Sequence, residues 1–400
     1  MPQLSSGYGL APWYRKGSQL DAIWIGQNGQ RAARRWAGLD LYLLVTTAVL
    51  VGFGIVVIWS AEGAGPLRLG SLAVRQALYA LVGLPLLLGL TWLDYRYIKS
   101  LAWVIYAVSL FLLALVDFIG TNIGGSVRWI DIGPVTLQPS EPAKLGVLIA
   151  LATLLADHWE EMHRFTWFVL SGVLVAIPMG LVYQQPDLGT AGVFAAIWLA
   201  LILVSPVRKR YVFALLLASP AVALFAWRYV LHDYMRQRLL ISFHPERDYF
   251  GAGFNIIQAQ ITIGTGGLLG NGLAGSMQSQ LGLLRVRTTD FIFAHAMGMF
   301  GFVGALALIV AYGLLLWRLI HVAEVAADRF AHLLAIGVTV MIFFQAFVNM
   351  GMNVGIMPVT GLPLPFVSYG GSSLWTLFAS LGIMQSILVH RRRIGFRSFG

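Results

Sequence analysis

The sequence predicts an all-α polytopic membrane protein with about ten transmembrane helices and one large extracytoplasmic loop between the seventh and eighth. Hydrophobic residues make up 58% of the 400 residues, and charged residues make up only 11%. The mean hydropathy is +0.76. Because a soluble domain is about half apolar and about one quarter charged, this composition excludes the soluble classes.

Apolar runs recur along the chain at the length that a helix needs to cross a hydrocarbon core of about 30 Å. They cover Leu41–Ser60, Ala77–Leu93, Leu101–Ile119, Ala143–Ala156, Phe165–Val182, Thr190–Val204, Val212–Leu231, Phe291–Leu316, Phe330–Val348 and Ser373–Val389. We expect one membrane domain at 39–389, between an N-terminal tail at 1–38 and a basic C-terminal tail at 390–400. No signal peptide is expected before the first run, and the absence of cysteine excludes disulfides.

The 27 Lys and Arg residues are concentrated in the tails and in the short loops of one side. Because short cytoplasmic loops carry an excess of Lys and Arg, both termini are predicted to be cytoplasmic. Membrane topology then accounts for the basic charge, and nucleic-acid binding is not expected. The polar segments that contain specific motifs are all predicted to lie on the extracytoplasmic side. There the N-termini of the following helices favour phosphate or diphosphate groups.

The segment around the fourth run allows two interpretations. Ser140 can cap the helix, and Glu141 and Lys144 share one helix face at i,i+3. The segment is therefore either a capped helix with a local ion pair, or a place where Arg128 and Lys144 meet an anionic substrate. The second interpretation follows because charges held at bilayer depth are costly and usually functional.

Two further segments have ordinary structural explanations. Asp187 lies in the turn Gln184–Thr190, where Asp and Gly are common turn residues, and we favour that role. The ninth run carries Gln345, Asn349 and Asn353 at i, i+4 and i+8, which places them on one helix face. Such a stripe forms hydrogen bonds between helices or, as the alternative, lines a cavity.

The long outer loop, residues 232–290, is rich in arginine and glycine. Its polar residues include Arg236, Arg238, His244, Arg247, Asp248, Asn255 and Gln258. Arginines suit a diphosphate substrate, although a charged rim attracted to anionic lipid headgroups is the alternative. The glycine cluster Gly264–Gly272 matches neither the dinucleotide motif nor the phosphate loop, which argues against nucleotide binding.

Asp290 closes this loop where the eighth run begins. Position alone favours a helix cap over a catalytic role. The neighbouring Arg287 would help to keep its carboxylate ionised, as a general base or a metal ligand requires. Both roles can coexist at this residue.

Four ordered motifs together closely resemble the SEDS family, which includes RodA, FtsW and SpoVE. They are Gln138–Lys144, Gln185–Gly189, Thr289–Phe293 and Pro358–Ser373. The similarity runs from about Asp40 to about Leu388, and the sequence of Thr360–Pro365 is more similar to RodA than to FtsW.

This resemblance implies a peptidoglycan glycosyltransferase that polymerises lipid II, an undecaprenyl-diphosphate disaccharide-peptide, into glycan for cell elongation and shape. It would act at the outer face of the bacterial cytoplasmic membrane with a class B penicillin-binding protein. Asp290 matches the family's essential acid, which either deprotonates the acceptor sugar or helps to hold a divalent cation, Mg²⁺ or Mn²⁺. The expected substrate-binding residues are Arg128, Glu141, Lys144, Asp187, Arg236, Arg238, Asn255, Gln258, Thr289, Asn353, Ser368 and Ser372.

The chain departs from the family pattern in two places. Members commonly have His where Thr288 stands, and an acidic pair where this chain reads Ala294–Met299. Two other functions therefore stay open, a flippase for lipid-linked precursors and a weakly active or non-catalytic scaffold of the elongation or division machinery. The motifs crowd one face and no internal repeat is evident, which favours the enzyme over a transporter.

Overall fold

The computed structural model describes residues 38–123, 126–133, 135–248 and 251–391. The tails predicted at 1–38 and 390–400 lie almost entirely outside these residues. One compact unit, which begins at Leu41, holds all of the helices and strands described.

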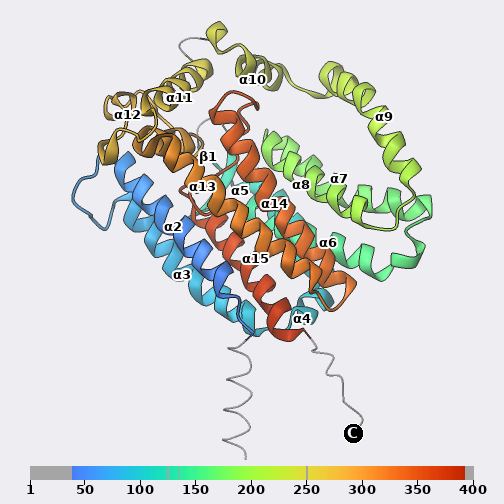
Figure 1. The fold of residues 1–400 in the computed structure, drawn as a ribbon. Helices are drawn as coiled ribbons and strands as arrows, with labels where there is room; N and C mark the ends of the chain where they lie inside the picture. Colours follow the sequence, from blue (N-terminus) through green and yellow to red (C-terminus); the bar gives the residue numbers. More distant parts are fainter. Residues whose placement is uncertain (1–37, 124–125, 134, 249–250, 392–400) are drawn as a thin grey trace, which may run out of the picture. The chain divides into compact units, whose positions relative to one another are not determined.

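Within the described ranges, eight helices are long and apolar enough to cross a membrane (Figure 1). They are α2 (Leu41–Ala61), α3 (Leu72–Trp92), α5 (Ala102–Ile119), α7 (Phe165–Gln184), α9 (Lys209–Phe225) with the π-helical turn Ala226–Val230, α13 (Ile292–Glu324), α14 (Arg329–Asn353) and α15 (Gly371–His390). The other two predicted spans are also helices, α6 (Ser140–Asp157) and α8 (Leu188–Val204). The former carries three charged residues and the latter has only 17 residues, so neither matches a typical span. The predicted helical architecture with multiple membrane spans is confirmed, although the described residues also contain three short strands.

Helices α14 and α15 form the interior of the bundle, whereas α9 lies at its periphery. Of the apolar window in each helix, 83% of the residues are buried in α15 and 67% in α14, but only 6% in α9. The α15 helix packs against α3 and α6, and α14 packs against α6, α8 and α13. Buried Ser, Thr and Gln side chains along α15 suit this position, because small and polar residues allow close helix packing inside a membrane protein.

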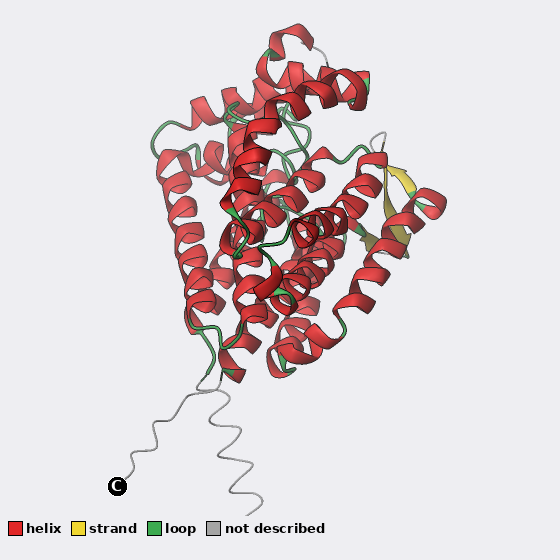
Figure 2. Cartoon of the chain, turned by 90° about the vertical axis from the view of Figure 1, so that its right-hand side faces the viewer, coloured by secondary structure: helices red, strands yellow, loops and turns green. Residues whose placement is uncertain are grey.

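The polar segments that were predicted to be extracytoplasmic are folded. Strands β1 (Thr121–Ile123), β2 (Ser126–Ile132) and β3 (Val135–Leu137) pair antiparallel in chain order (Figure 2). The long loop contains the short helices α10 (Asp233–Phe243), α11 (Ala252–Gly266) and α12 (Met277–Gln280), with 3₁₀ turns at Pro245–Asp248 and Gly272–Ala274. The helix α11 packs against α13.

The first part of α13 is separated from the rest by a break at Gly301. This glycine has φ 62° and ψ −158°, and a Cβ atom there would lie 2.4 Å from the backbone nitrogen of Gly270. The interrupted helix bonds to the turn that follows α11, because Phe302 N donates to Gly267 O at 2.9 Å. Non-helical backbone at membrane depth needs such internal partners. The long loop is therefore attached to the start of α13.

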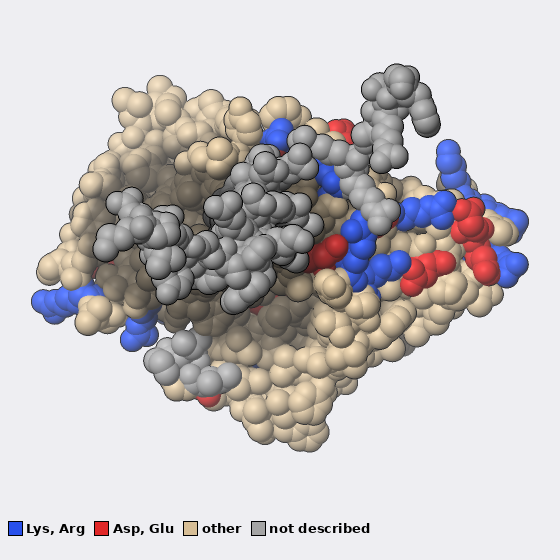
Figure 3. All heavy atoms as spheres, turned by 90° about the horizontal axis from the view of Figure 1, so that it is seen from below, with Lys and Arg blue, Asp and Glu red and all other residues tan. Residues whose placement is uncertain are grey.

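Ion pairs occur at the end of the bundle where α4 (Tyr95–Ser100) lies. Figure 3 views the molecule from this end and shows basic and acidic side chains together over one part of it. Lys99 Nζ lies 2.6 Å from Asp157 Oδ1, and Arg329 Nη2 lies 2.7 Å from Glu160 Oε1. These pairs are exposed, so each contributes about 1 kcal/mol or less. The residues belong to loops that the sequence assigns to the cytoplasmic side.

Candidate active site

Segments that are far apart in the sequence meet beside Asp290. A Cβ atom at Gly361 would lie 3.8 Å from Asp290 Oδ2 and 3.7 Å from Arg238 Nη2. Gly361 has φ +78°, so a larger residue there would be strained and would enter the space beside both groups. The same loop reaches the turn before α8, since a Cβ atom at Gly189 would lie 2.9 Å from Thr360 O. The structure thus brings together motifs that the sequence predicts to be extracytoplasmic.

Asp290 does not cap α13. The residue at the N-cap position is Phe291, and no side chain provides a capping hydrogen bond there, so the cap prediction is wrong. Instead, the backbone oxygen of Asp290 accepts hydrogen bonds from Asn349 Nδ2 at 3.1 Å and Asn353 Nδ2 at 2.9 Å. These bonds fix the backbone, and the carboxylate is left to face the loop at Gly361.

The carboxyl group of Asp290 experiences opposing effects. Burial raises its pKa above the usual range of an aspartate. The Arg238 guanidinium and a hydrogen bond from the Thr289 side chain lower the pKa, as does the charge of Arg128 to a smaller extent. The charge of Asp187 raises it. Because the net direction is upward, Asp290 has the character of a proton acceptor that is matched to a less acidic pH.

Arg128 is held by the turn before α8. Its Nε donates to Gln185 O at 2.6 Å, a second hydrogen bond reaches Pro186 O, and Nη1 lies 3.9 Å from Asp187 Oδ1. Asp187 also caps α8, because Oδ1 accepts from Thr190 N at 3.1 Å. The structural role predicted for Asp187 is confirmed, and the same turn positions an arginine beside the site.

The polar stripe of α14 forms hydrogen bonds that hold the site. Asn353 Oδ1 accepts from Ala294 N at 3.0 Å, and Asn349 Nδ2 also donates to Leu362 O at 2.8 Å. The hydrogen-bonding interpretation is therefore confirmed for these two asparagines. Asn349 was missed as a site residue, although its i,i+4 spacing from Asn353 was a usable signal. Gln345 differs, because its buried amide has no hydrogen-bond partner among the described residues.

We expect Asn353→Leu to destabilise the protein by about 1–3 kcal/mol, because it leaves the Ala294 N–H and the Asp290 carbonyl less satisfied in a buried place. Thermal unfolding of the purified protein measures the effect. Thr339→Val on the same helix is the matched control, since the hydrogen bond of the Thr339 hydroxyl among the described residues is to Ala335 O of its own helix. Equal unfolding temperatures for the two variants would contradict this role of Asn353.

The segment at the start of α6 is largely internal. Glu141 and Lys144 form an ion pair of 2.8 Å with side-chain exposures of 4% and 1%, so the local-pair prediction is confirmed. Ser140 does not cap the helix, because Pro139 occupies the N-cap position and the buried Ser140 Oγ has no described partner. The capping prediction for Ser140 is wrong. Substrate contact by Glu141 or Lys144 stays a prediction.

Two serines of the loop before α15 and of its first turn hold backbone segments in place. Ser368 Oγ donates to Thr289 O at 2.8 Å and accepts from Leu364 N at 2.9 Å. Ser372 Oγ accepts from Gln138 N at 2.9 Å, which joins α15 to the segment after β3. These contacts are structural, and direct substrate binding by the two serines stays a prediction.

The other predicted residues of the long loop are not placed at Asp290 by any described contact. Arg236 Nη1 lies 3.2 Å from Asp233 Oδ1, and Nη2 donates to Arg228 O at 3.0 Å. On α11, Asn255 Oδ1 is buried and has no hydrogen-bond partner among the described residues. The backbone oxygen of Gln258 accepts a hydrogen bond from Thr262 Oγ1. Their roles with substrate stay predictions.

Comparison with known proteins places this site in a family. Residues 41–393 match the cell cycle protein family of FtsW, RodA and SpoVE. The chain belongs to this family. It is 38% identical over 357 residues to the peptidoglycan glycosyltransferase MrdB of Escherichia coli K12, which covers 89% of this chain and 95% of that protein. The probable peptidoglycan glycosyltransferase FtsW of Halothiobacillus neapolitanus is 35% identical over 365 residues, covering 87% and 86%.

Solved structures of the family agree with the fold. A chain from work on the structural coordination of polymerization and crosslinking by a peptidoglycan synthase complex has a TM-score of 0.77 and 34% identity, covering 89% of this chain and 99% of that one. The rod shape determining protein RodA of Thermus thermophilus has a TM-score of 0.67 and 33% identity, covering 90% and 99%. The expected SEDS membership is confirmed.

The two departures from the SEDS pattern have visible structural consequences. At the place where the resemblance leads us to expect an acidic pair, this chain has the fully buried His295, whose ring nitrogens lie 3.2 Å from Ser60 Oγ and 2.8 Å from Ser279 Oγ. The imidazole therefore joins α2, α12 and α13. Thr288, where members commonly have His, bonds Tyr369 N through its carbonyl oxygen at 2.9 Å.

The side chains around Asp290 do not by themselves fit a divalent cation. Among the described residues, no group of three or more His, Asp or Glu is arranged to hold a metal. The nearest charged groups include Arg238 and Arg128, which repel a cation. A cation bound through Asp290 would need oxygen ligands from a substrate. The predicted metal role stays a prediction.

Proposed function

We infer that this chain is a peptidoglycan glycosyltransferase that polymerises lipid II into glycan. The observation that carries the inference is one carboxylate, Asp290, beside the guanidinium of Arg238, at a place where four outer segments meet. A glycosyl transfer needs a base for the attacking hydroxyl and positive charge for the departing diphosphate. Both groups are present here, and the family relatives carry the same named activity.

The proposed reaction forms one bond and breaks one bond. The hydroxyl oxygen at C4 of the acceptor sugar attacks C1 of the donor sugar, and Asp290 accepts the hydroxyl proton. The bond between C1 and the phosphate oxygen breaks, and undecaprenyl diphosphate departs with the bonding electrons. Arg238 and Arg128 stabilise the negative charge of that group, because charge-assisted hydrogen bonds from guanidinium to phosphate are strong.

We propose that the reaction takes place at the outer face of the bacterial cytoplasmic membrane, with both termini inside. The positive-inside distribution of Lys and Arg supports this orientation. We further propose a class B penicillin-binding protein as partner. Support comes from the similar chain of a peptidoglycan synthase complex, which concerns polymerization and crosslinking together.

A flippase is the second candidate, and a scaffold is the third. The cluster around Asp290 lies where outer segments meet the helix ends, rather than between two repeated halves. That position favours an enzyme over a flippase. A scaffold would not need a carboxylate whose backbone is fixed by two asparagines.

Polymerisation of labelled lipid II by the purified protein tests the function. We expect long glycan on a gel when the class B partner and a divalent cation are supplied. The same reaction with Mg²⁺, with Mn²⁺ and with EDTA tests the cation prediction. Absence of glycan under every condition would contradict the enzyme, and transbilayer movement of the lipid by the same preparation would support the flippase.

The polymerisation rate is expected to fall on acidification at a higher pH than the ionisation of an exposed aspartate would give. Asp290 must be deprotonated to act as a base, and burial raises its pKa, so protonation removes the active form sooner as the pH falls. Initial rates from about pH 4 to 8 measure this acidic decline of the pH–rate profile. In Arg238→Gln the decline should begin at a still higher pH, because the guanidinium lowers the pKa of Asp290. An unchanged pH–rate profile in this variant would contradict the assignment of Asp290 as the base.

A further inference from the structure

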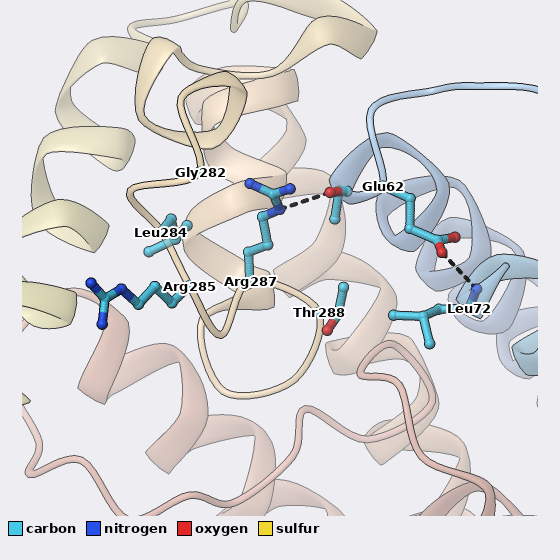
Figure 4. A pocket seen from close by; sticks show the side chains of 8 residues that line it. Glu62, Leu72, Gly282, Leu284, Arg285, Arg287 and Thr288 are labelled. Atoms are coloured by element: carbon cyan, nitrogen blue, oxygen red, sulfur yellow. Dashed lines mark hydrogen bonds between the residues drawn. The ribbon is translucent and has the colours of Figure 1, made fainter. Parts of the chain in front are cut away.

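A cavity lies beside the segment that leads to Asp290. It has a volume of about 410 Å³ and lies between the facing ends of α2 and α3 and residues 282–288 (Figure 4). Its lining comprises Ala61, Glu62, Leu72, Gly282, Leu284, Arg285, Arg287 and Thr288. Three of these eight residues are charged, which is unusual in a bundle where only 11% of residues are charged. The mechanism proposed above uses none of them.

The charged groups of the cavity are fixed in place by backbone contacts. The Glu62 carboxylate accepts from Leu72 N at 2.8 Å and from Ala73 N at 3.1 Å. Arg287 Nε donates to Ala61 O at 2.7 Å, and Nη1 donates to Ser279 O. Among the described residues, Glu62 and Arg287 form no ion pair with one another. The cavity therefore presents a carboxylate and a guanidinium whose positions are fixed by the backbone.

Arg285 extends the positive side of the cavity. Its guanidinium lies 5.9 Å above the ring of Phe254, and the side chain is exposed. Figure 4 shows Arg285 directed away from Glu62, with Arg287 between them. Positive and negative groups thus occupy different parts of one lining. A ligand that matches them carries separated charges of both signs.

The cavity is adjacent to the reacting centre. Thr288 lines it, and Asp290 is only two residues further along the chain, at most about 7 Å away between Cα atoms. The intervening turn is held by Ser368 Oγ, which donates to Thr289 O, and by Tyr369 N, which donates to Thr288 O. A substrate at Asp290 can therefore place one of its substituents in this cavity.

We propose that the cavity binds the peptide carried by the lipid-linked sugar, with its carboxylates at Arg285 and Arg287 and its ammonium at Glu62. This inference rests on the proposed function. A diphosphate or an uncharged sugar fits the lining less well, because Glu62 would repel the former and would gain no charged partner from the latter. The hydroxyl of Thr288 provides a further neutral contact for a peptide amide.

Binding measurements test the proposal without requiring turnover. The full-length protein in nanodiscs is titrated with lipid II whose peptide has a free side-chain amine, and with the same lipid-linked disaccharide without peptide. We expect Glu62→Gln and Arg285→Gln each to raise the Kd for the peptide-bearing lipid about tenfold, and to leave the Kd for the peptide-free lipid unchanged. Gln at position 62 keeps one of the two oxygens that accept from Leu72 N and Ala73 N, so the peptide-free lipid, whose Kd reports on the fold of this region, serves as the internal control.

A lipid with an acetylated peptide amine tests whether Glu62 binds that amine. Acetylation of the peptide amine should raise the Kd of the wild-type protein by about the same factor as Glu62→Gln, and the two changes together should add little. Arg68→Gln, on the exposed connection between α2 and α3, is the matched control and should change neither Kd. Equal Kd values for both lipids in all proteins would overturn the peptide site. Peptide-dependent binding without glycan synthesis would overturn the proposed function alone.

Discussion

Replacing Asp290 with Asn is expected to lower the rate of lipid II polymerisation by about 10²–10⁴-fold, which is the range for losing a general base. The amide has nearly the shape of the carboxylate but cannot accept the proton of the acceptor hydroxyl. The two asparagine contacts to the backbone oxygen of Asp290 do not involve the side chain, so the local fold should persist. Initial rates of glycan formation at saturating lipid II measure the change.

The matched control for this variant is Asp131→Asn, an identical change at an exposed acid on strand β2. It should retain the wild-type rate. Both variants should also retain binding to the class B partner. If Asp290→Asn polymerised lipid II as fast as Asp131→Asn, a base at position 290 would be excluded, and the scaffold interpretation would gain support.

Replacing Arg238 with Gln is expected to reduce the rate by about 10²–10³-fold, because it removes a preorganised positive charge from the departing diphosphate. The guanidinium lies beside Asp290, with Gly361 next to both groups. The effect should fall mainly on kcat, because negative charge on the leaving oxygen grows in the transition state. Arg238→Lys should recover part of the rate, since Lys keeps the charge but loses the planar fork of donors.

Arg164→Gln provides the control for the loss of one arginine. Arg164 forms an exposed pair with Glu161 at the end of the bundle away from the site, so its replacement should leave kcat unchanged. A decrease in kcat of equal size in both variants would point to a general loss of charge or stability. A change only in KM for Arg238→Gln would show that Arg238 acts in ground-state binding and not in leaving-group departure.

The chain departs from its family at positions that surround the site without forming it. His295 is enclosed by Ser60 and Ser279, where it bonds both hydroxyls. Arg287, which lines the cavity, bonds the backbone of that same Ser279. Where the resemblance leads us to expect an acidic pair, this chain therefore has a hydrogen-bonded cluster that is linked to the cavity through Arg287. The carboxylate of Asp290 and the guanidinium of Arg238 lie outside this cluster, beside Gly361.

The sequence by itself determined the membrane fold and the family. Apolar runs and their spacing depend on the hydrocarbon core, which acts on each segment separately, so helices could be predicted from local hydropathy at each of the ten apolar runs, eight of which are long and apolar enough to span a membrane among the described residues. Three local motifs indicated the correct family: Gln138–Lys144, Gln185–Gly189 and Pro358–Ser373. A local motif can be recognised from its sequence without knowledge of distant contacts. The i,i+3 pair of Glu141 and Lys144 was predictable for the same reason.

Only the tertiary structure decided which groups those motifs present to one another. Ser140 and Asp290 both occupy positions where helix caps are common, yet neither residue caps a helix. Ser140 is buried in the interior, and two asparagine side chains bind the backbone oxygen of Asp290. Glu62 and Arg287 are 225 positions apart and share one cavity. Such partnerships arise from packing between distant helices, and hydropathy and local propensity carry no information about them.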